Sequence, residues 1–193
     1  MILRESQWKF GTSAGLGIGF DSFAADAGMF VLKDPSGRGR QYKYSGFGPD
    51  FSRALTSWMR VPKLALPKII VRKGEISSAS STPALPGVGR VYLTSSFSEE
   101  DLDTPDRLNG GTIYLEGAAG YLFGGVGSFM LLGLNPKLLM FGIARPEFIG
   151  KAIQSAPAAL AMMGANAGLQ DSAGFSFMLG QVTYNGLYSD DPA

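Results

Sequence analysis

The sequence contains no cysteine and no histidine, and these two absences exclude most of the common catalytic and metal-binding chemistry. Without cysteine there is no disulfide framework, no thiolate nucleophile and no cysteine-ligated zinc or iron–sulfur centre. Without histidine there is no Ser-His-Asp triad and no imidazole acid or base. Paired carboxylates, a Ser-Lys pair or a hard metal held by oxygen ligands remain, and no motif indicates any of them. We therefore expect a protein that is not an enzyme, with no catalytic residues, no cofactor and no metal site.

Charged residues are also scarce, at 17% of the 193 residues against roughly 25% in an average protein. The net charge is +1, but residues 1–73 carry +7 and residues 74–193 carry −6. Because the whole chain is near neutral, we expect no nucleic-acid partner. The basic residues between positions 51 and 73 are candidates for contact with an anionic lipid surface, or form an ordinary solvated face. They are Arg53, Arg60, Lys63, Lys68, Arg72 and Lys73.

Glycine is abundant, with 27 residues, and its spacing indicates strands. Gly15, Gly17 and Gly19 alternate with apolar residues, which predicts a strand with a glycine face near the end of 8–20. Further strands are expected at 27–33, 41–47 and 91–93, the first two joined by the turn Asp34-Pro35-Ser36-Gly37. Ser98, followed by three acidic residues, predicts a short helix that ends before Pro105.

We expect one mainly β (α+β) domain, 1–193, of glycine-rich antiparallel strands in a sandwich or small barrel. It would comprise β-hairpins (1–60), a Pro/Ser-rich connector (61–89), strands (90–135), a short helical segment (136–163) and C-terminal strands (164–189). Asn135-Pro136 and Arg145-Pro146 each have the form of a helix start. They predict helices at 136–144 and 146–154, and the alanine-rich run 157–163 predicts a third.

The span 117–136 has no charged residue and is just long enough to cross a bilayer as a helix. The pairs Gly120/Gly124 and Gly164/Gly168 would allow close helix packing in a membrane. Six glycines within 117–133 would cost a helix in water about 1 kcal/mol each, so a buried pair of strands is the alternative. A third possibility combines the membrane helix and the buried strands. The protein would shield 117–136 and 152–170 in a soluble state and expose them in a membrane-inserted state. The candidate packing and insertion residues are Gly117, Gly120, Gly124, Gly127, Phe129, Leu131, Gly164 and Gly168.

Several stretches carry a resemblance to a known family: DPSGRGRQYKYSGFG (34–48), VPKLALPKI (61–69), PGVGRVYLTSSF (86–97), GGTIYLEGAAGYLFGGVGSFMLLGLN (110–135) and GANAGLQDSAGFSFMLG (164–180). In composition and order these stretches resemble small glycine-rich effectors of the type VI secretion system of Gram-negative bacteria, particularly those that form pores in the inner membrane of rival cells. The resemblance implies delivery by a contractile apparatus, an immunity protein in the producer, and depolarisation as the toxic event. The N-terminus lacks the apolar region and cleavage site of a secretory signal, which agrees with export from the bacterial cytoplasm without a signal peptide.

The function expected is therefore that of a membrane-active antibacterial effector that acts at the target cell membrane, with self-association on insertion. Two other classes of function stay open at this point. A glycine-lined apolar cavity would suit a soluble carrier of a lipid or another hydrophobic ligand. Glycine-rich apolar faces would equally suit a structural or interaction subunit of a larger assembly.

Overall fold

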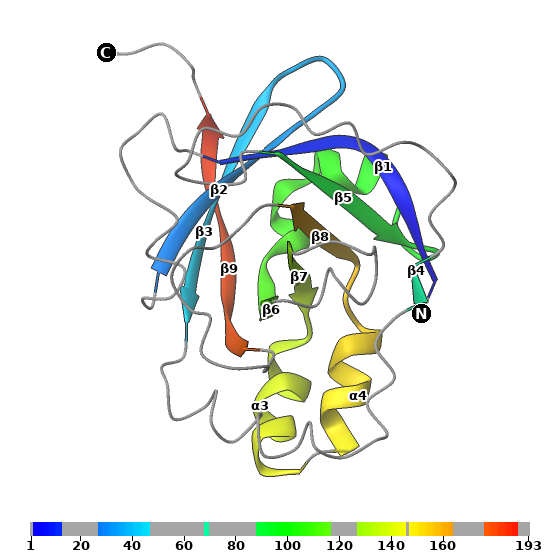
Figure 1. The fold of residues 1–193 in the computed structure, drawn as a ribbon, viewed down its shortest axis with the longest axis vertical. Coiled ribbons are helices and arrows are strands. Elements are labelled where there is room, and N and C mark those ends of the chain that lie inside the picture. Colours follow the sequence, from blue (N-terminus) through cyan, green and yellow to red (C-terminus); the bar gives the residue numbers. More distant parts are fainter. Residues whose placement is uncertain are drawn as a thin grey trace.

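The chain forms a closed antiparallel β-barrel of eight strands (Figure 1). The computed structural model describes residues 2–12, 27–46, 68–69, 88–116, 127–145, 147–163 and 176–188. Around the barrel the strand order is β1 (Ile2–Thr12), β2 (Ala27–Lys33), β3 (Gly39–Gly46), β9 (Ser176–Tyr188), β6 (Gly110–Glu116), β7 (Gly127–Leu134), β8 (Ala158–Met163) and β5 (Val88–Thr94). A two-residue strand, β4 (Lys68–Ile69), pairs in parallel with the start of β1. Among the described strands, closure leaves no long unpaired edge.

Closure depends on β1, which pairs with β5 along most of its length and with β2 at its C-terminal end. The β1–β2 seam has only four residue pairs, from Lys9↔Lys33 to Thr12↔Phe30. By comparison, β3 and β9 pair over eight positions. Among the described residues, the seam is therefore the shortest pairing in the ring.

Alternate residues of all eight strands face the barrel interior and form one core. Aromatic rings fill much of it, and glycines on neighbouring strands make room for them. A Cβ at Gly89 would lie 2.8 Å from the Phe10 ring, and one at Gly180 would lie 2.5 Å from the Tyr44 ring. The interior side chains from the strands are Trp8, Phe10, Phe30, Leu32, Tyr42, Tyr44, Val91, Leu93, Tyr114, Met130, Leu132, Ala158, Leu160 and Val182.

A second apolar cluster lies on the outer wall of the barrel, beneath two helices. Helix α3 (Pro136–Ala144) begins at Asn135, whose side chain accepts hydrogen bonds from the N–H groups of Lys137 and Leu138 at 3.0 and 3.2 Å. Helix α4 (Glu147–Gln154) buries Ile149, Ala152 and Ile153, at the spacing of one helix face. The two helices lie side by side at the lower end of Figure 1.

The mainly β fold, the single domain and the barrel alternative are confirmed. The turn at Asp34–Gly37, strands near 27–33, 41–47 and 91–93, and the helices near 136–144 and 146–154 are also confirmed. The acidic run forms two short 3-10 helices, η3 (Glu100–Asp103) and η4 (Pro105–Leu108), the first of which ends before Pro105 as expected. Strand β1 begins at Ile2, earlier than the glycine pattern indicated, and residues 13–20 lie outside the described part.

The expected third helix at 157–163 is wrong, because residues 158–163 form strand β8 between β5 and β7. Alanine favours helices by well under 1 kcal/mol per residue, and tertiary context overrides that preference. Here Ala158 and Leu160 face the interior, whereas Ala159 and Ala161 face the outer cluster. Small side chains on both faces let the helices approach the wall.

The span 117–136 is not one helix, since residues 127–134 form strand β7 and α3 starts only at Pro136. For this part of the span the buried-strand alternative is the correct one. Residues 117–126 lie outside the described part. Within the described ranges, no helix is both long enough and apolar enough to cross a bilayer.

Candidate functional site

One end of the barrel is closed by a segment that we call the plug, residues 95–109, which contains η3 and η4. Its apolar side chains Phe97, Leu102 and Leu108 are at most 6% exposed and join the interior core. Six of its 15 residues are charged. The plug therefore presents an apolar side to the barrel and a charged side outward.

Polar side chains of the barrel hold the plug in place. Arg40, 9% exposed, donates hydrogen bonds to the carbonyl oxygen of Leu102 and, at 3.0 Å, to the carboxylate of Asp103. Its guanidinium also lies 4.7 Å from the centre of the Trp8 ring, within cation–π range. One buried cation from β3 thus links the interior core to the plug.

Strands β1 and β9 add further contacts to the plug. Glu99 accepts hydrogen bonds from the hydroxyl of Ser6 at 2.7 Å and from the N–H of Gln7 at 3.2 Å. The N–H of Tyr184 donates to the side chain of Asn109 at 2.6 Å. Three strands from different parts of the chain therefore fix the plug.

The acidic residues of the plug are engaged in bonds within the protein. The Ser98 N–H holds the pKa of Asp101 below its usual value, helped by the Ser98 hydroxyl and by Arg107. The described residues contain no group of three or more carboxylates, cysteines or histidines that could hold a metal ion. Within that part of the chain, the acidic run has a structural role in closing the barrel.

The strand ends at the opposite end of the barrel are joined by connections of a different composition. Antiparallel registers place the ends of β1, β3, β6 and β8 there, beside the starts of β2, β5, β7 and β9. Three of the connecting sequences, 13–26, 117–126 and 164–175, contain only three charged residues, Asp21, Asp26 and Asp171. The fourth, 47–87, joins β3 to β5 and contains six basic and two acidic residues. The barrel thus has one plugged end rich in carboxylates and one end where three charge-poor sequences and one basic sequence begin and return.

Most of the site residues expected from sequence fall outside the described part of the chain. This applies to Gly117, Gly120, Gly124, Gly164 and Gly168, and to Arg53, Arg60, Lys63, Arg72 and Lys73. Among the rest, Gly127 starts β7 and Lys68 starts β4. Phe129 and Leu131 are fully buried on the outer wall beneath the helices. The structure therefore shields these two side chains.

The plug and its anchor Arg40 were not identified from the sequence. Arg40 and Asp103 are 63 positions apart, and no motif links them. The only local signal was the helix start at Ser98. It predicts the first helical turn of the plug, but it does not indicate that the plug closes the end of the barrel. The exposed side of α3 and α4 was likewise missed, because its apolar and basic residues have the composition of an ordinary amphipathic helix.

The fold defines a small closed β-barrel protein, filled by its own side chains, plugged at one end and flanked by a helical hairpin. The chain is 30% identical over 190 residues to the toxin protein Tse4 of Pseudomonas aeruginosa, an alignment that covers 93% of this chain and 95% of that protein. It therefore belongs to the family of toxin protein Tse4. This confirms the resemblance to effector toxins at the level of the family. No protein-family model and no solved structure matches the chain.

Proposed function

We propose that this protein is a membrane-active antibacterial effector that forms a pore and depolarises the target cell. Membership of a toxin family supports the toxic role. The proposal includes export from the bacterial cytoplasm by a type VI apparatus without a cleaved signal peptide, and a cognate immunity protein in the producer. The action proposed is physical rather than catalytic.

The observation that carries the proposal is the difference between the two ends of the barrel. At one end the plug, rich in carboxylates, is anchored by Arg40 and Glu99. At the other end, three charge-poor connecting sequences and the basic sequence 47–87 begin and return. Burying a charge in hydrocarbon costs about 2.5–3.5 kcal/mol or more, which favours the three charge-poor sequences over the plug as the parts that enter a bilayer.

The barrel is also built in a way that suits rearrangement. In the part of the chain that the structure describes, its ring is closed by a seam of four residue pairs between β1 and β2. Phe129 and Leu131, expected to contact the membrane, are buried beneath α3 and α4 in this state. A shielded state of this kind is what an effector needs in the producing cell, because exposed apolar surface would promote aggregation.

The carrier alternative is disfavoured by the interior of the barrel. Fourteen strand side chains and three from the plug pack together there. A ligand would have to displace this core, which would cost the burial energy of several large side chains. The alternative of a subunit in a larger assembly remains as an outcome of the experiment below.

Conductance across a planar anionic bilayer, after addition of the purified protein, tests the proposal. A pore-former gives discrete, voltage-dependent current steps. A silent bilayer with folded protein, together with ordered oligomers in detergent-free buffer, would instead identify an assembly subunit. Replacement of Gly120 and Gly124 by Ile should abolish the current, because bulky side chains prevent close packing in the inserted state. Gly150→Ala, on helix α4 with open space around it, is the control and should conduct normally.

A further inference from the structure

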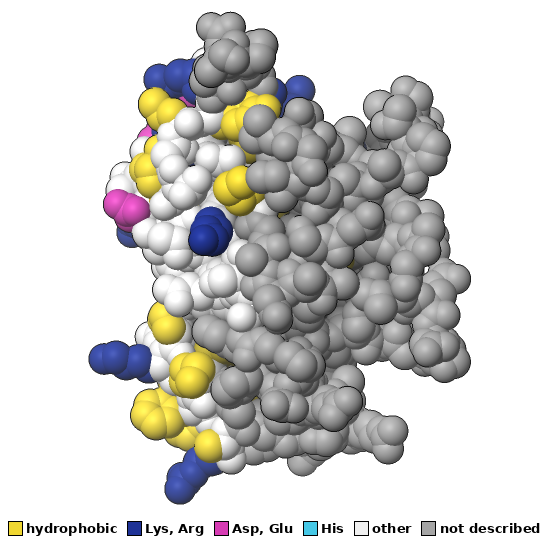
Figure 2. Space-filling model, turned by 90° about the vertical axis from the view of Figure 1, so that its left-hand side faces the viewer, with side chains coloured by type: hydrophobic (Ala, Val, Ile, Leu, Met, Phe, Trp, Pro, Cys, Tyr) yellow, Lys and Arg dark blue, Asp and Glu magenta, His cyan; other side chains and the backbone are white. Residues whose placement is uncertain are grey.

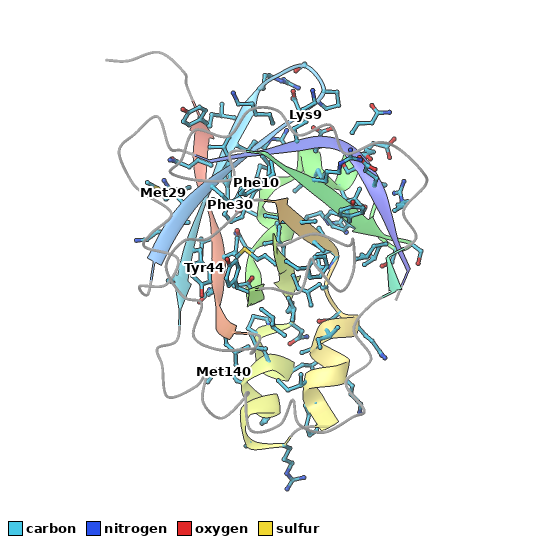
Figure 3. All side chains as sticks on the ribbon, viewed as in Figure 1. Lys9, Phe10, Met29, Phe30, Tyr44 and Met140 are labelled. Atoms are coloured by element: carbon cyan, nitrogen blue, oxygen red, sulfur yellow. The ribbon has the colours of Figure 1, made fainter. Side chains whose placement is uncertain are left out.

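The outward side of the helical hairpin combines exposed apolar and basic side chains, and the proposed pore does not use it. Met140 is 48% exposed and Phe141 is 60% exposed, and the described residues contain one other exposed large hydrophobic, Leu187 on β9. Figure 2 shows apolar side chains between two cations at the end of the molecule where the hairpin lies, and Figure 3 labels Met140 on α3. We call this surface the hairpin face: Lys137, Met140, Phe141, Arg145, Phe148 and Lys151.

Contacts across the two helices make the hairpin face continuous. The rings of Phe141 on α3 and Phe148 on α4 have centres 5.9 Å apart. The Lys151 ammonium lies 5.4 Å from the centre of the Phe148 ring. Lys137 and Phe141 are four positions apart on α3 and therefore share one side of that helix. The apolar centre is thus bordered by cations on both helices.

The charge of the hairpin favours an anionic partner. Residues 136–154 contain three basic residues, Lys137, Arg145 and Lys151, and one acid, Glu147. Long basic side chains beside exposed rings can place their charges among lipid headgroups while the rings enter the acyl boundary. A protein partner would have to supply both an apolar pocket and several anionic groups, whereas an anionic bilayer offers acyl chains and negatively charged headgroups at every point of its surface.

We propose that the hairpin face docks in the interface of an anionic lipid bilayer, with Met140, Phe141 and Phe148 inserted and the three cations at headgroup level. This deepens the function proposed above and rests on it. Helix α3 has nine residues and is about 14 Å long, far short of the roughly 30 Å hydrocarbon core. The hairpin therefore lies in the membrane surface.

Flotation of the full-length protein with vesicles of phosphatidylglycerol and phosphatidylcholine tests the apolar part of this docking. The double variant Met140→Ser/Phe141→Ser should lose at least about tenfold in partitioning, because it removes the two exposed apolar side chains that enter the acyl boundary. Leu187→Ser is the matched control, since Leu187 is 75% exposed but lies on β9. It should float like the wild type. The replaced side chains are 48–75% exposed, and circular dichroism verifies that both variants fold.

The same assay tests the cations. Lys137→Gln/Lys151→Gln should weaken binding to anionic vesicles by about fivefold per cation removed, at about 1 kcal/mol for each. Binding to pure phosphatidylcholine should not change. Lys9→Gln/Lys43→Gln removes two exposed cations from the barrel strands and should leave anionic binding as it is.

Docking and pore formation are separated by measuring conductance in parallel. If the hairpin variants float like the wild type, the docking inference is wrong, even if the protein conducts. If the wild type floats through the hairpin face but gives no current, the docking inference stands and the pore proposal fails. A wild type that does not float with anionic vesicles overturns the docking inference, whatever its conductance.

Discussion

Asp34 organises the β2–β3 turn through both of its carboxylate oxygens. One oxygen accepts from the Ser36 hydroxyl at 2.6 Å and from the Arg38 N–H at 2.9 Å, and the other accepts from the Arg38 Nε at 2.8 Å. The side chain of Asp34 is 4% exposed. The turn also needs Gly37, whose φ of +90° is a conformation that other residues rarely adopt. The bonds from Ser36 and Arg38 lower the pKa of Asp34 to about 2.

The lowered pKa of Asp34 predicts a specific acid sensitivity. The folded-state pKa lies below the unfolded value of about 3.9, so the stabilisation is present above about pH 4 and is lost as the pH falls towards 2. Asp34→Asn should lower the free energy of unfolding at neutral pH and flatten its decline between pH 4 and pH 2. Urea unfolding at a series of pH values measures this. Glu100→Gln, at an exposed carboxyl, is the control and should keep the wild-type decline.

At the scale of the elements, the close approach of α3 and α4 depends on one glycine. A Cβ at Gly142 would lie 2.5 Å from the end of the Ile149 side chain and 3.1 Å from the Ile149 backbone nitrogen. Ile149 is itself buried against the barrel wall, so it has little room to move. By contrast, Gly150 on α4 faces open space. The hairpin therefore has one glycine that a neighbouring side chain crowds and one that nothing crowds.

These two glycines give a matched pair of variants. Gly142→Val should destabilise the protein by about 1–3 kcal/mol through overpacking. Gly150→Ala should stabilise it by up to about 1 kcal/mol, because alanine is the better helix former and meets no neighbour. Thermal unfolding followed by circular dichroism measures both. Equal effects in the two variants would show that the helices do not cross at Gly142.

At the scale of the whole molecule, the barrel has a β1–β2 seam and two unlike ends. The pore proposal requires the shielded state to rearrange, and this seam, with four pairs, is the shortest link in the ring among the described residues. Lys9 and Lys33 are direct partners across that seam, and neither side chain joins the interior core. Direct cross-strand partners have Cα atoms about 4.5–5.5 Å apart, a distance that a disulfide can span.

Because the chain has no cysteine, a single engineered disulfide can lock the seam. Lys9→Cys/Lys33→Cys should conduct in a planar bilayer when reduced and lose conductance when oxidised. The control, Met29→Cys/Lys43→Cys, links β2 to β3 within one hairpin, where locking leaves the seam free. It should conduct in both redox states. Full conductance of the oxidised seam variant would show that the barrel inserts without opening there.

Much of the fold follows from short-range signals that can be read along the chain. The Asn135 cap and the Asp34–Gly37 turn between β2 and β3 each depend on neighbours within a few positions. The glycine-rich composition indicated close packing of strands, and Gly180 against Tyr44 shows its use. The candidate site was harder to predict from the sequence. Arg40 and Leu102 are 62 positions apart, and only the folded barrel brings them into contact.

The sequence by itself determined a mainly β, glycine-rich single domain with two capped helices and no cysteine or histidine chemistry. Only the tertiary structure decided that Ala158–Met163 is a strand, that the acidic run is a plug, and that α3 and α4 cover Phe129 and Leu131. The physical reason is the range of the interactions. Caps and turns are local, whereas strand pairing and burial depend on partners that the fold brings together from distant parts of the chain.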